Sequence, residues 1–376
     1  MEWVGFAIGL FVVVGTWSSI LRTLVVPRGL ASKLTATVDR IVQRGFLTMA
    51  NRFDDYDRKD AILVAQGPFS LLILLVTWLA LLLIGFALVA TPFIVGNLGD
   101  AVIEAGSSMF TLGFAAANGT GPAIIHFLAA ATGLIVVALQ IAYLPTLYAA
   151  FNRRETLVTM LQSRAGSPAW GAEILARHHI VGILDNMPAF YAEWEQWAAD
   201  VAESHTNYPI LIRFRSPHPL RSWIVGLLAV MDSAALYMAL CPDRSPSEAR
   251  LCTRMGFLSL RDIASVVHLE FDPDPFPDDP IELTFDEFLG GVKRLEEVGF
   301  PMERSPEEAW AHFKGWRVNY EKVAYALADR AVAPPGPWSG PRHHLPGLQI
   351  IPRRPANRGP GDHRADRHPR GEGQGW

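Results

Sequence analysis

Three stretches of the chain consist almost entirely of apolar residues, and each is about as long as a helix that crosses a bilayer. They cover residues 3–21, 67–93 and 123–151. Because about 20 mostly apolar residues are needed to cross the hydrocarbon core, the pattern predicts three transmembrane helices. A fourth apolar stretch, residues 222–240, carries Asp232 at its centre, where insertion costs about 2.5–3.5 kcal/mol. We interpret it as the core helix of a water-soluble part.

The positive charges are distributed unevenly around these stretches. No lysine or arginine occurs between Lys59 and Arg153, whereas residues 22–66 carry eight of them. Since short cytoplasmic loops collect Lys and Arg, we expect an external N-terminus, three crossings of the plasma (inner) membrane, and a cytoplasmic part from residue 153 onward. The one charged residue before the first stretch is the acidic Glu2, whereas a cleaved signal peptide begins with positively charged residues. The first stretch is therefore predicted to stay as an anchor.

The loop between the second and third apolar stretches contains a short motif at its centre. Residues 98–110 provide about three helical turns, and Thr111-Leu112-Gly113-Phe114-Ala115 follows directly. Backbone carbonyls of successive residues can face one axis only if alternate residues adopt a positive φ, which glycine does without steric cost. The position of Gly113 therefore fits a loop that presents its backbone oxygens to one side.

This succession of a helix, a re-entrant loop with Thr-x-Gly-aromatic, and a second helix resembles the pore module of the potassium channel family over residues 67–154. In that family four copies of a Thr-Val-Gly-Tyr-Gly loop surround one axis, and their carbonyls replace the water around the ion. The resemblance implies an all-α membrane protein that forms a homotetramer. It also implies conduction of a monovalent cation, with potassium the expected ion and no other cofactor.

The resemblance assigns the selectivity filter residue by residue. The residues that take the filter positions are Thr111, Leu112, Gly113, Phe114 and Ala115. Ala115 and Ala116 stand where the family has its second glycine and an aspartate. A left-handed alanine costs about 1–2 kcal/mol, so the outer part of the filter is expected to depart from the family geometry.

Further pore residues are expected on either side of the filter. Asp100 and Glu104 would add negative charge at the outer mouth, or be ordinary solvated loop residues. In the third stretch, Gly133 is a hinge or a close-packing residue, and Pro145 predicts a kink near a gate. Gln140 is expected to line the pore or to make a hydrogen bond between helices.

The predicted organisation has five parts. Residues 1–21 form the first transmembrane helix, 22–66 a cytoplasmic amphipathic linker, 67–152 the pore module, 153–330 a cytoplasmic all-α domain, and 331–376 a disordered tail. The linker mixes apolar and basic positions at helical spacing, so membrane lipids are expected partners. Helix starts in the domain are predicted at three capping boxes, beginning at Ser245, Thr284 and Ser305, and at Pro168 and Pro217.

Other chemistry is weakly represented, and neither an enzyme nor a nucleic-acid-binding protein is predicted. No Walker loop, HExxH motif or G-x-S-x-G elbow occurs. The acidic run of residues 272–280 lacks the glycine and glutamate of an EF-hand, and Cys241 and Cys252 fit core packing better than a zinc site. The polar residues 204–209 fit a turn better than a ligand site. The alternative function is a membrane-anchored scaffold or sensor whose pore loop does not conduct.

Overall fold

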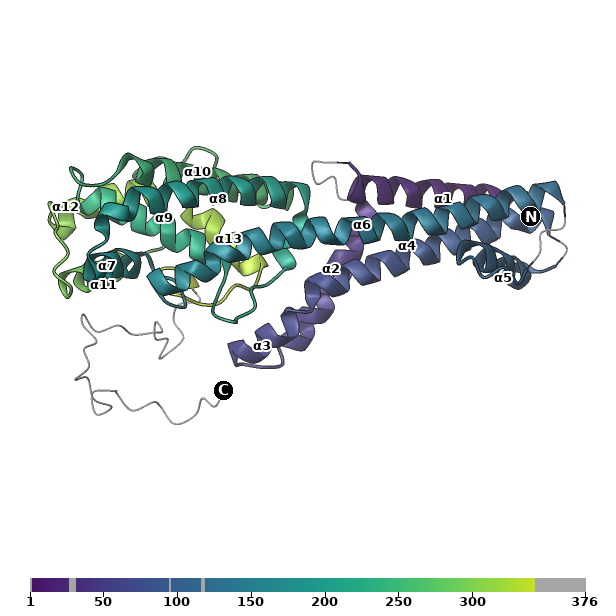
Figure 1. Ribbon diagram of the computed structural model, residues 1–376, viewed down its shortest axis with the longest axis horizontal. Helices are drawn as coiled ribbons and strands as arrows, with labels where there is room; N and C mark the ends of the chain where they lie inside the picture. Colours follow the sequence, from purple (N-terminus) through teal and green to yellow (C-terminus); the bar gives the residue numbers. More distant parts are fainter. Residues whose placement is uncertain (1, 27–31, 95, 116–118, 342–376) are drawn as a thin grey trace.

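The computed structural model describes residues 2–26, 32–94, 96–115 and 119–341. Within them the fold is built from helices, and no β-strand is found in these ranges. Figure 1 shows an elongated molecule with a bundle of long helices at one end and a compact helical domain at the other. The long helix α6 (Thr120–Ala165) runs from the bundle into the domain. This confirms the all-α class.

Four helical stretches are long and apolar enough to cross a membrane. Three belong to the bundle: α1 (Glu2–Leu24), the stretch Tyr56–Phe93 that contains α4 (Gln66–Ala90) and the short 3-10 helix η1 (Thr91–Phe93), and α6. Only 28 to 39% of their most apolar windows is buried inside the protein. The fourth, α9 (Trp223–Leu240), is 100% buried. The bundle helices therefore expose apolar surface, and α9 exposes none.

Helix α6 is longer than the sequence predicted. It continues beyond the apolar stretch 123–151 to Ala165 and ends at Gly166, whose φ is +78°. Charged residues such as Arg153 do not break a helix, whereas a left-handed glycine does. Pro145 lies inside the helix and does not end it.

Close approaches between small residues set the packing of the bundle. A Cβ atom on Gly9 would lie 2.6 Å from the Gly85 carbonyl oxygen, so α1 and α4 touch through their backbones. Ser19 accepts a 3.0 Å hydrogen bond from the Trp78 indole. Gly9 thus meets Gly85, and Ser19 meets Trp78. Because residue numbers rise along α1 while those of the contacting residues fall along α4, the two helices are antiparallel.

The linker forms two helices, α2 (Lys33–Ala50) and α3 (Tyr56–Leu63). Val38, Val42 and Phe46 are buried on one face of α2, and Phe46 packs on Phe69 at the start of α4. The opposite face carries exposed arginines. The amphipathic character predicted for this segment is therefore confirmed.

The helical domain surrounds α9 with helices on several sides. Its other members are α7 (Gly171–Val181), α8 (Met187–Asn207), α10 (Ser247–Val266), α11 (Phe285–Glu296), α12 (Pro306–Arg317) and α13 (Glu321–Arg330), with 3-10 helices η2 (Leu184–Asn186) and η3 (Pro209–Arg213). Asp232 of α9 is buried against the Arg317 guanidinium and accepts a 2.8 Å hydrogen bond from the Tyr320 hydroxyl. These partners satisfy the charge that made α9 a poor transmembrane candidate.

The predicted helix starts have mixed outcomes. Thr284 and Ser305 form capping boxes, as predicted. The box at Ser245 was wrong, because α10 begins at Ser247 and the Ser245 hydroxyl donates to the Pro242 carbonyl instead. The starts at Pro168 and Pro217 were also wrong: the next helices begin at Gly171 and Trp223. Ser167, which precedes Pro168, stabilises a loop instead of starting a helix, because its hydroxyl donates to the Leu220 carbonyl at 3.2 Å.

The first residues of the expected disordered tail are folded onto the domain. Trp338 is 3% exposed, its ring packs on Trp170 and Phe313, and its indole donates to the Glu287 carbonyl at 3.1 Å. The Trp338 ring, together with hydrogen bonds from Arg317 and Tyr325 to the Trp338 carbonyl, thus holds a segment of poor core-forming composition. The prediction was wrong for residues 331–341, while residues 342–376 lie outside the described residues.

Candidate pore loop

The helix expected before the filter is present as α5 (Leu98–Met109). It begins with a capping box, in which Asn97 accepts from the Gly99 and Asp100 amides and the Asp100 carboxylate accepts from the Asn97 amide at 2.9 Å. Asp100 was expected at an outer mouth, and the structure uses its carboxylate to cap α5. A negative charge at this end also complements the helix dipole.

Two contacts give the depth at which α5 ends. A Cβ on Gly133 would lie only 2.1 Å from the Met109 carbonyl oxygen, and a Cβ on Gly106 would lie 3.5 Å from the Leu83 side chain. Gly133 is ten residues inside the apolar stretch of α6, which is about 15 Å of helix. The apolar stretch 123–151 has 29 residues, about 43 Å of helix, so the C-terminus of α5 lies about a third of the way along it, a distance of about half a 30 Å bilayer core.

The chain leaves α5 through a Schellman motif closed by a threonine. Thr111 has a φ of +54°, its amide donates to the Ser108 carbonyl at 3.0 Å, and the Leu112 amide donates to the Ser107 carbonyl at 2.8 Å. Glycine is the usual residue at this left-handed position. A threonine there costs about 1–2 kcal/mol, so the loop holds local strain at its first residue.

Ser107 organises the remainder of the loop. Its carbonyl oxygen also accepts from the Gly113 amide at 3.3 Å, and its hydroxyl accepts from the Ala115 amide at 3.1 Å. Gly113 has a φ of +73°, so positive φ recurs at alternate residues, 111 and 113. Ala115 does not adopt a positive φ, so the alternation of positive φ does not continue to this residue.

Three peptide units of the loop donate their amide hydrogens to Ser107, and their carbonyl oxygens point in the opposite direction. A planar trans peptide holds its carbonyl opposite its amide hydrogen, so the carbonyl oxygens of Thr111, Leu112 and Phe114 point away from Ser107. Within the described residues none of these oxygens accepts a hydrogen bond. The loop therefore presents free carbonyl oxygens on the side away from α5.

Large apolar side chains of the loop are exposed on the surface of the single chain. Phe110, Leu112 and Phe114 are 47, 63 and 66% exposed. On α6, Phe127 and Leu134 are exposed as well. Such a concentration of exposed apolar side chains marks a surface that contacts lipid or another protein chain.

A pair of ionisable residues connects α5 to α6, and the sequence reasoning missed its second member. Glu104 faces His126, with 3.2 Å between Oε2 and Nε2, and both side chains are largely buried. The contact does not have the geometry of a hydrogen bond. In the single chain Glu104 lies between the two helices, and its place at an outer mouth stays a prediction. A lone histidine within an apolar stretch was the available signal.

The three residues expected along the third apolar stretch occupy different surroundings. Gly133 serves close packing against α5, as one of its two interpretations required. Gln140 lies on the same buried face of α6 and is 6% exposed, with no hydrogen bond to its side chain among the described residues. In the single chain, Gln140 is thus covered by protein. Pro145 follows five residues later in the same helix.

The junction between bundle and domain centres on a buried arginine. Arg154 of α6 is fully buried and donates to the carbonyls of Leu211 and Phe214 at 2.9 and 2.8 Å. It also donates to Nε2 of His205 at 3.0 Å, which requires a neutral imidazole there. Burial, together with the charge of Arg154, holds the pKa of His205 well below its ordinary value.

The segment that includes η3 also grips the linker helices. Arg213 donates to Asp39 and Gln43 of α2 at 3.3 and 2.7 Å, and Arg215 donates to Asp60 of α3. Phe214 between them packs on Gly67 at the start of α4, where a Cβ would lie 2.7 Å from its ring. This short segment therefore contacts α2, α3 and α4, while α6 also meets the domain through α8, where Arg153 pairs with Asp200 at 3.1 Å.

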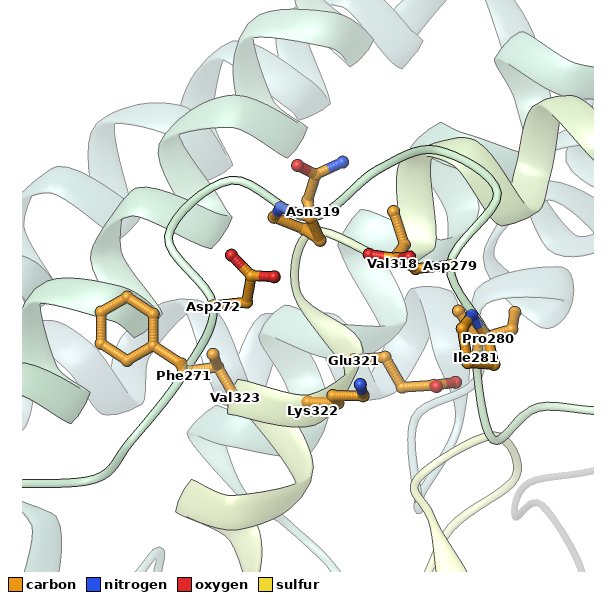
Figure 2. Close-up of a pocket in the computed structure, with 11 residues that line it drawn as sticks. Phe271, Asp272, Asp279, Pro280, Ile281, Val318, Asn319, Glu321, Lys322 and Val323 are labelled. Carbon is orange, nitrogen blue, oxygen red and sulfur yellow. The ribbon is translucent and has the colours of Figure 1, made fainter.

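The acidic run does not form a metal site. Figure 2 shows Asp272, Asp279 and Glu321 around a hollow of about 30 Å³, with their carboxylates pointing in different directions. Glu321 is engaged by Arg317 at 2.8 Å and by the Leu283 amide at 3.1 Å. Within the described residues there is no group of three side chains that could hold a metal.

Residues of the polar segment 204–209 and both cysteines are buried in the helical domain and contribute to its packing. His205 belongs to the Arg154 junction, and Ser204 donates to the Val201 carbonyl at 3.3 Å. Cys241 and Cys252 are free and buried, and burial raises the pKa of Cys241 to about 12. A thiol with so high a pKa is unreactive at neutral pH.

Comparison of the chain with protein-family models, curated proteins and solved structures finds no significant match.

Proposed function

We propose that the chain is the protomer of a homotetrameric cation channel whose ion pathway is lined by the loop Thr111 to Ala115. The observation that carries the proposal is the set of free carbonyl oxygens of Thr111, Leu112 and Phe114, whose neighbouring amides are held from behind by Ser107. Carbonyl rings of this kind replace the hydration shell of a monovalent cation. The expected ion is potassium.

The position of the loop supports this function. It begins where α5 ends, about 15 Å into the apolar stretch of α6, and a helix C-terminus carries about half a negative charge. Non-helical backbone at such a depth is tolerated only where it faces protein or a water-filled cavity. The exposed Phe110, Leu112 and Phe114 would be covered by neighbouring protomers.

The proposed topology has three crossings, by α1, α4 and α6, with the helical domain and the linker in the cytoplasm. The complete burial of α9 favours its place as a core helix over a fourth crossing. The antiparallel arrangement of α1 and α4 agrees with consecutive crossings. The arginines between α1 and α4 support a cytoplasmic position for the linker.

A matched pair of glycine variants tests the proposal. Gly113 has a φ of +73° and Gly299 in the helical domain has a φ of +72°, and at both residues a Cβ would find no other atom within 4 Å. Alanine therefore introduces similar backbone strain at both sites without a steric clash. In liposomes, wild type and Gly299→Ala should carry potassium flux, whereas Gly113→Ala should lose flux or potassium-over-sodium preference.

The stoichiometry provides an independent test. The protein in mild detergent should have the mass of four chains, and a monomer or dimer would exclude a central pore. A tetramer without flux of potassium, sodium or rubidium over a range of voltage and pH would instead support the alternative function, a membrane-anchored scaffold or sensor.

A further inference from the structure

An open groove of about 670 Å³ lies on the helical domain between α10, α12 and the loop before α11. Its charged and aromatic lining consists of Arg250, Arg254, Phe257, Arg261, Asp274 and Trp316. Small-molecule sites commonly enclose about 300–1,000 Å³, so the groove has room for a metabolite. Figure 1 shows α12 at the end of the molecule remote from the bundle.

Two of the arginines have no anionic partner. Arg250 and Arg254 are one helical turn apart on the exposed face of α10 and form no ion pair within the described residues. Like charges at this spacing on a helix repel each other. A bound anion between them would remove that repulsion.

Aromatic rings and backbone carbonyls hold the groove in shape. The Arg250 guanidinium lies 5.8 Å from the centre of the Trp316 ring, and that of Arg261 lies 4.8 Å from the Phe257 ring. Arg261 donates to the carbonyls of Pro273 and Asn319 at 2.7 and 3.0 Å. A stacked guanidinium is restricted in its motion before a ligand arrives, which lowers the entropic cost of binding.

The charge of the groove is positive overall. Asp274 is the acidic residue that lines the groove. Burial lowers the pKa of Arg261, and the negative charges of Asp272 and Asp274 raise it. Arg261 and Asp274 thus offset each other, and the charges of Arg250 and Arg254 remain. Two guanidinium groups with free N–H donors match the oxygens of a phosphate better than a single carboxylate would.

We propose that this groove binds a small phosphate-bearing anion, with Arg250 and Arg254 as its ligands to phosphate. The phosphate can come from a soluble oligophosphate or nucleotide, or from a lipid headgroup. The remote position of α12 favours the soluble source. The site does not depend on ion conduction by the loop.

The test is calorimetric titration of the full-length protein in lipid nanodiscs with inorganic tripolyphosphate, ATP and adenosine. Saturable binding of tripolyphosphate or ATP, with none of adenosine, is the expected result. Arg250→Ala with Arg254→Ala should weaken binding at least tenfold. Arg244→Ala removes an exposed positive charge outside the groove, 59% exposed and paired with Glu303, and should leave binding unchanged.

Vesicles of neutral lipid with and without phosphatidylinositol phosphate separate the two sources. Binding to the anionic vesicles alone, weakened by the two groove variants, would identify a lipid phosphate at the same site. The proposal is overturned if none of the phosphate probes binds saturably, or if the groove variants and Arg244→Ala weaken binding equally.

Discussion

Replacement of Gly133 by alanine perturbs the contact that fixes the end of α5. A Cβ atom there would lie 2.1 Å from the Met109 carbonyl oxygen and 2.8 Å from the Met109 side chain. Ordinary contact begins at 3.4 Å, so the two helices must separate by about 1.3 Å. Because Met109 is two residues before Thr111, this movement displaces the proposed filter directly.

The expected cost follows from the same contact. Overpacking of a tight interface costs about 1–3 kcal/mol, while replacement of glycine by alanine in a helix returns about 0.5–1 kcal/mol. Gly133→Ala should therefore destabilise the bundle by about 1–2 kcal/mol. Gly15→Ala in α1 is the matched control, because nothing lies within 4 Å of its Cβ position. That variant should be neutral or slightly stabilising.

Thermal unfolding in detergent and potassium flux in liposomes measure the two consequences. Gly133→Ala should melt at a lower temperature than Gly15→Ala and should lose flux. If Gly133→Ala matches the control in both measurements, α5 is not docked on α6 as described, and the assignment of the loop to mid-membrane depth fails.

Three further predictions concern single side chains. Ser107→Ala releases the Ala115 amide, so potassium-over-sodium preference should fall while tetramers persist, as ion-replacement currents would measure; unchanged selectivity would remove Ser107 from the filter scaffold. The folded-state pKa of His205 lies below its unfolded value of about 6.5, so wild-type stability should be lost as pH falls below that value, by up to about 1.4 kcal/mol per unit. His205→Gln should show a shallower loss in pH-dependent unfolding, and an identical slope would contradict a buried neutral imidazole. Thr284→Ala should cost about 1 kcal/mol through its lost cap and Ser245→Ala almost nothing, and equal melting temperatures would refute the capping difference.

The sequence predicted those parts of the fold that depend on local pattern. Apolar length located the bundle helices, and the stretch 98–110 was expected to be a helix because it has room for about three turns before the Thr-x-Gly-aromatic motif. The caps at Thr284 and Ser305 were found for the same reason. Ser245 has an equivalent pattern and fails, because its hydroxyl finds a nearer carbonyl in the folded chain.

The parts that were missed depend on contacts between distant residues. Glu104 and His126 are separated by a loop whose path the sequence does not give, so their pairing was invisible. Trp338 belongs to a segment with too few apolar residues to form a core, but it fills a space that other helices provide. Gln140 was assigned by its polarity alone, and the helices packed on α6 determine which way it faces.

The unbroken course of α6 makes it a stiff rod. Its 46 residues correspond to about 69 Å, and about 32 Å of that length separates Gly133 beside the loop from Arg154 in the junction. No loop interrupts the helix between these two points, and Pro145, which removes one backbone hydrogen bond, lies between them, so a tilt or a twist of the helical domain would reach the end of α5 through the helix around Pro145. A torque applied by the domain and transmitted along several turns of α6 is how a movement of the domain can reach the loop.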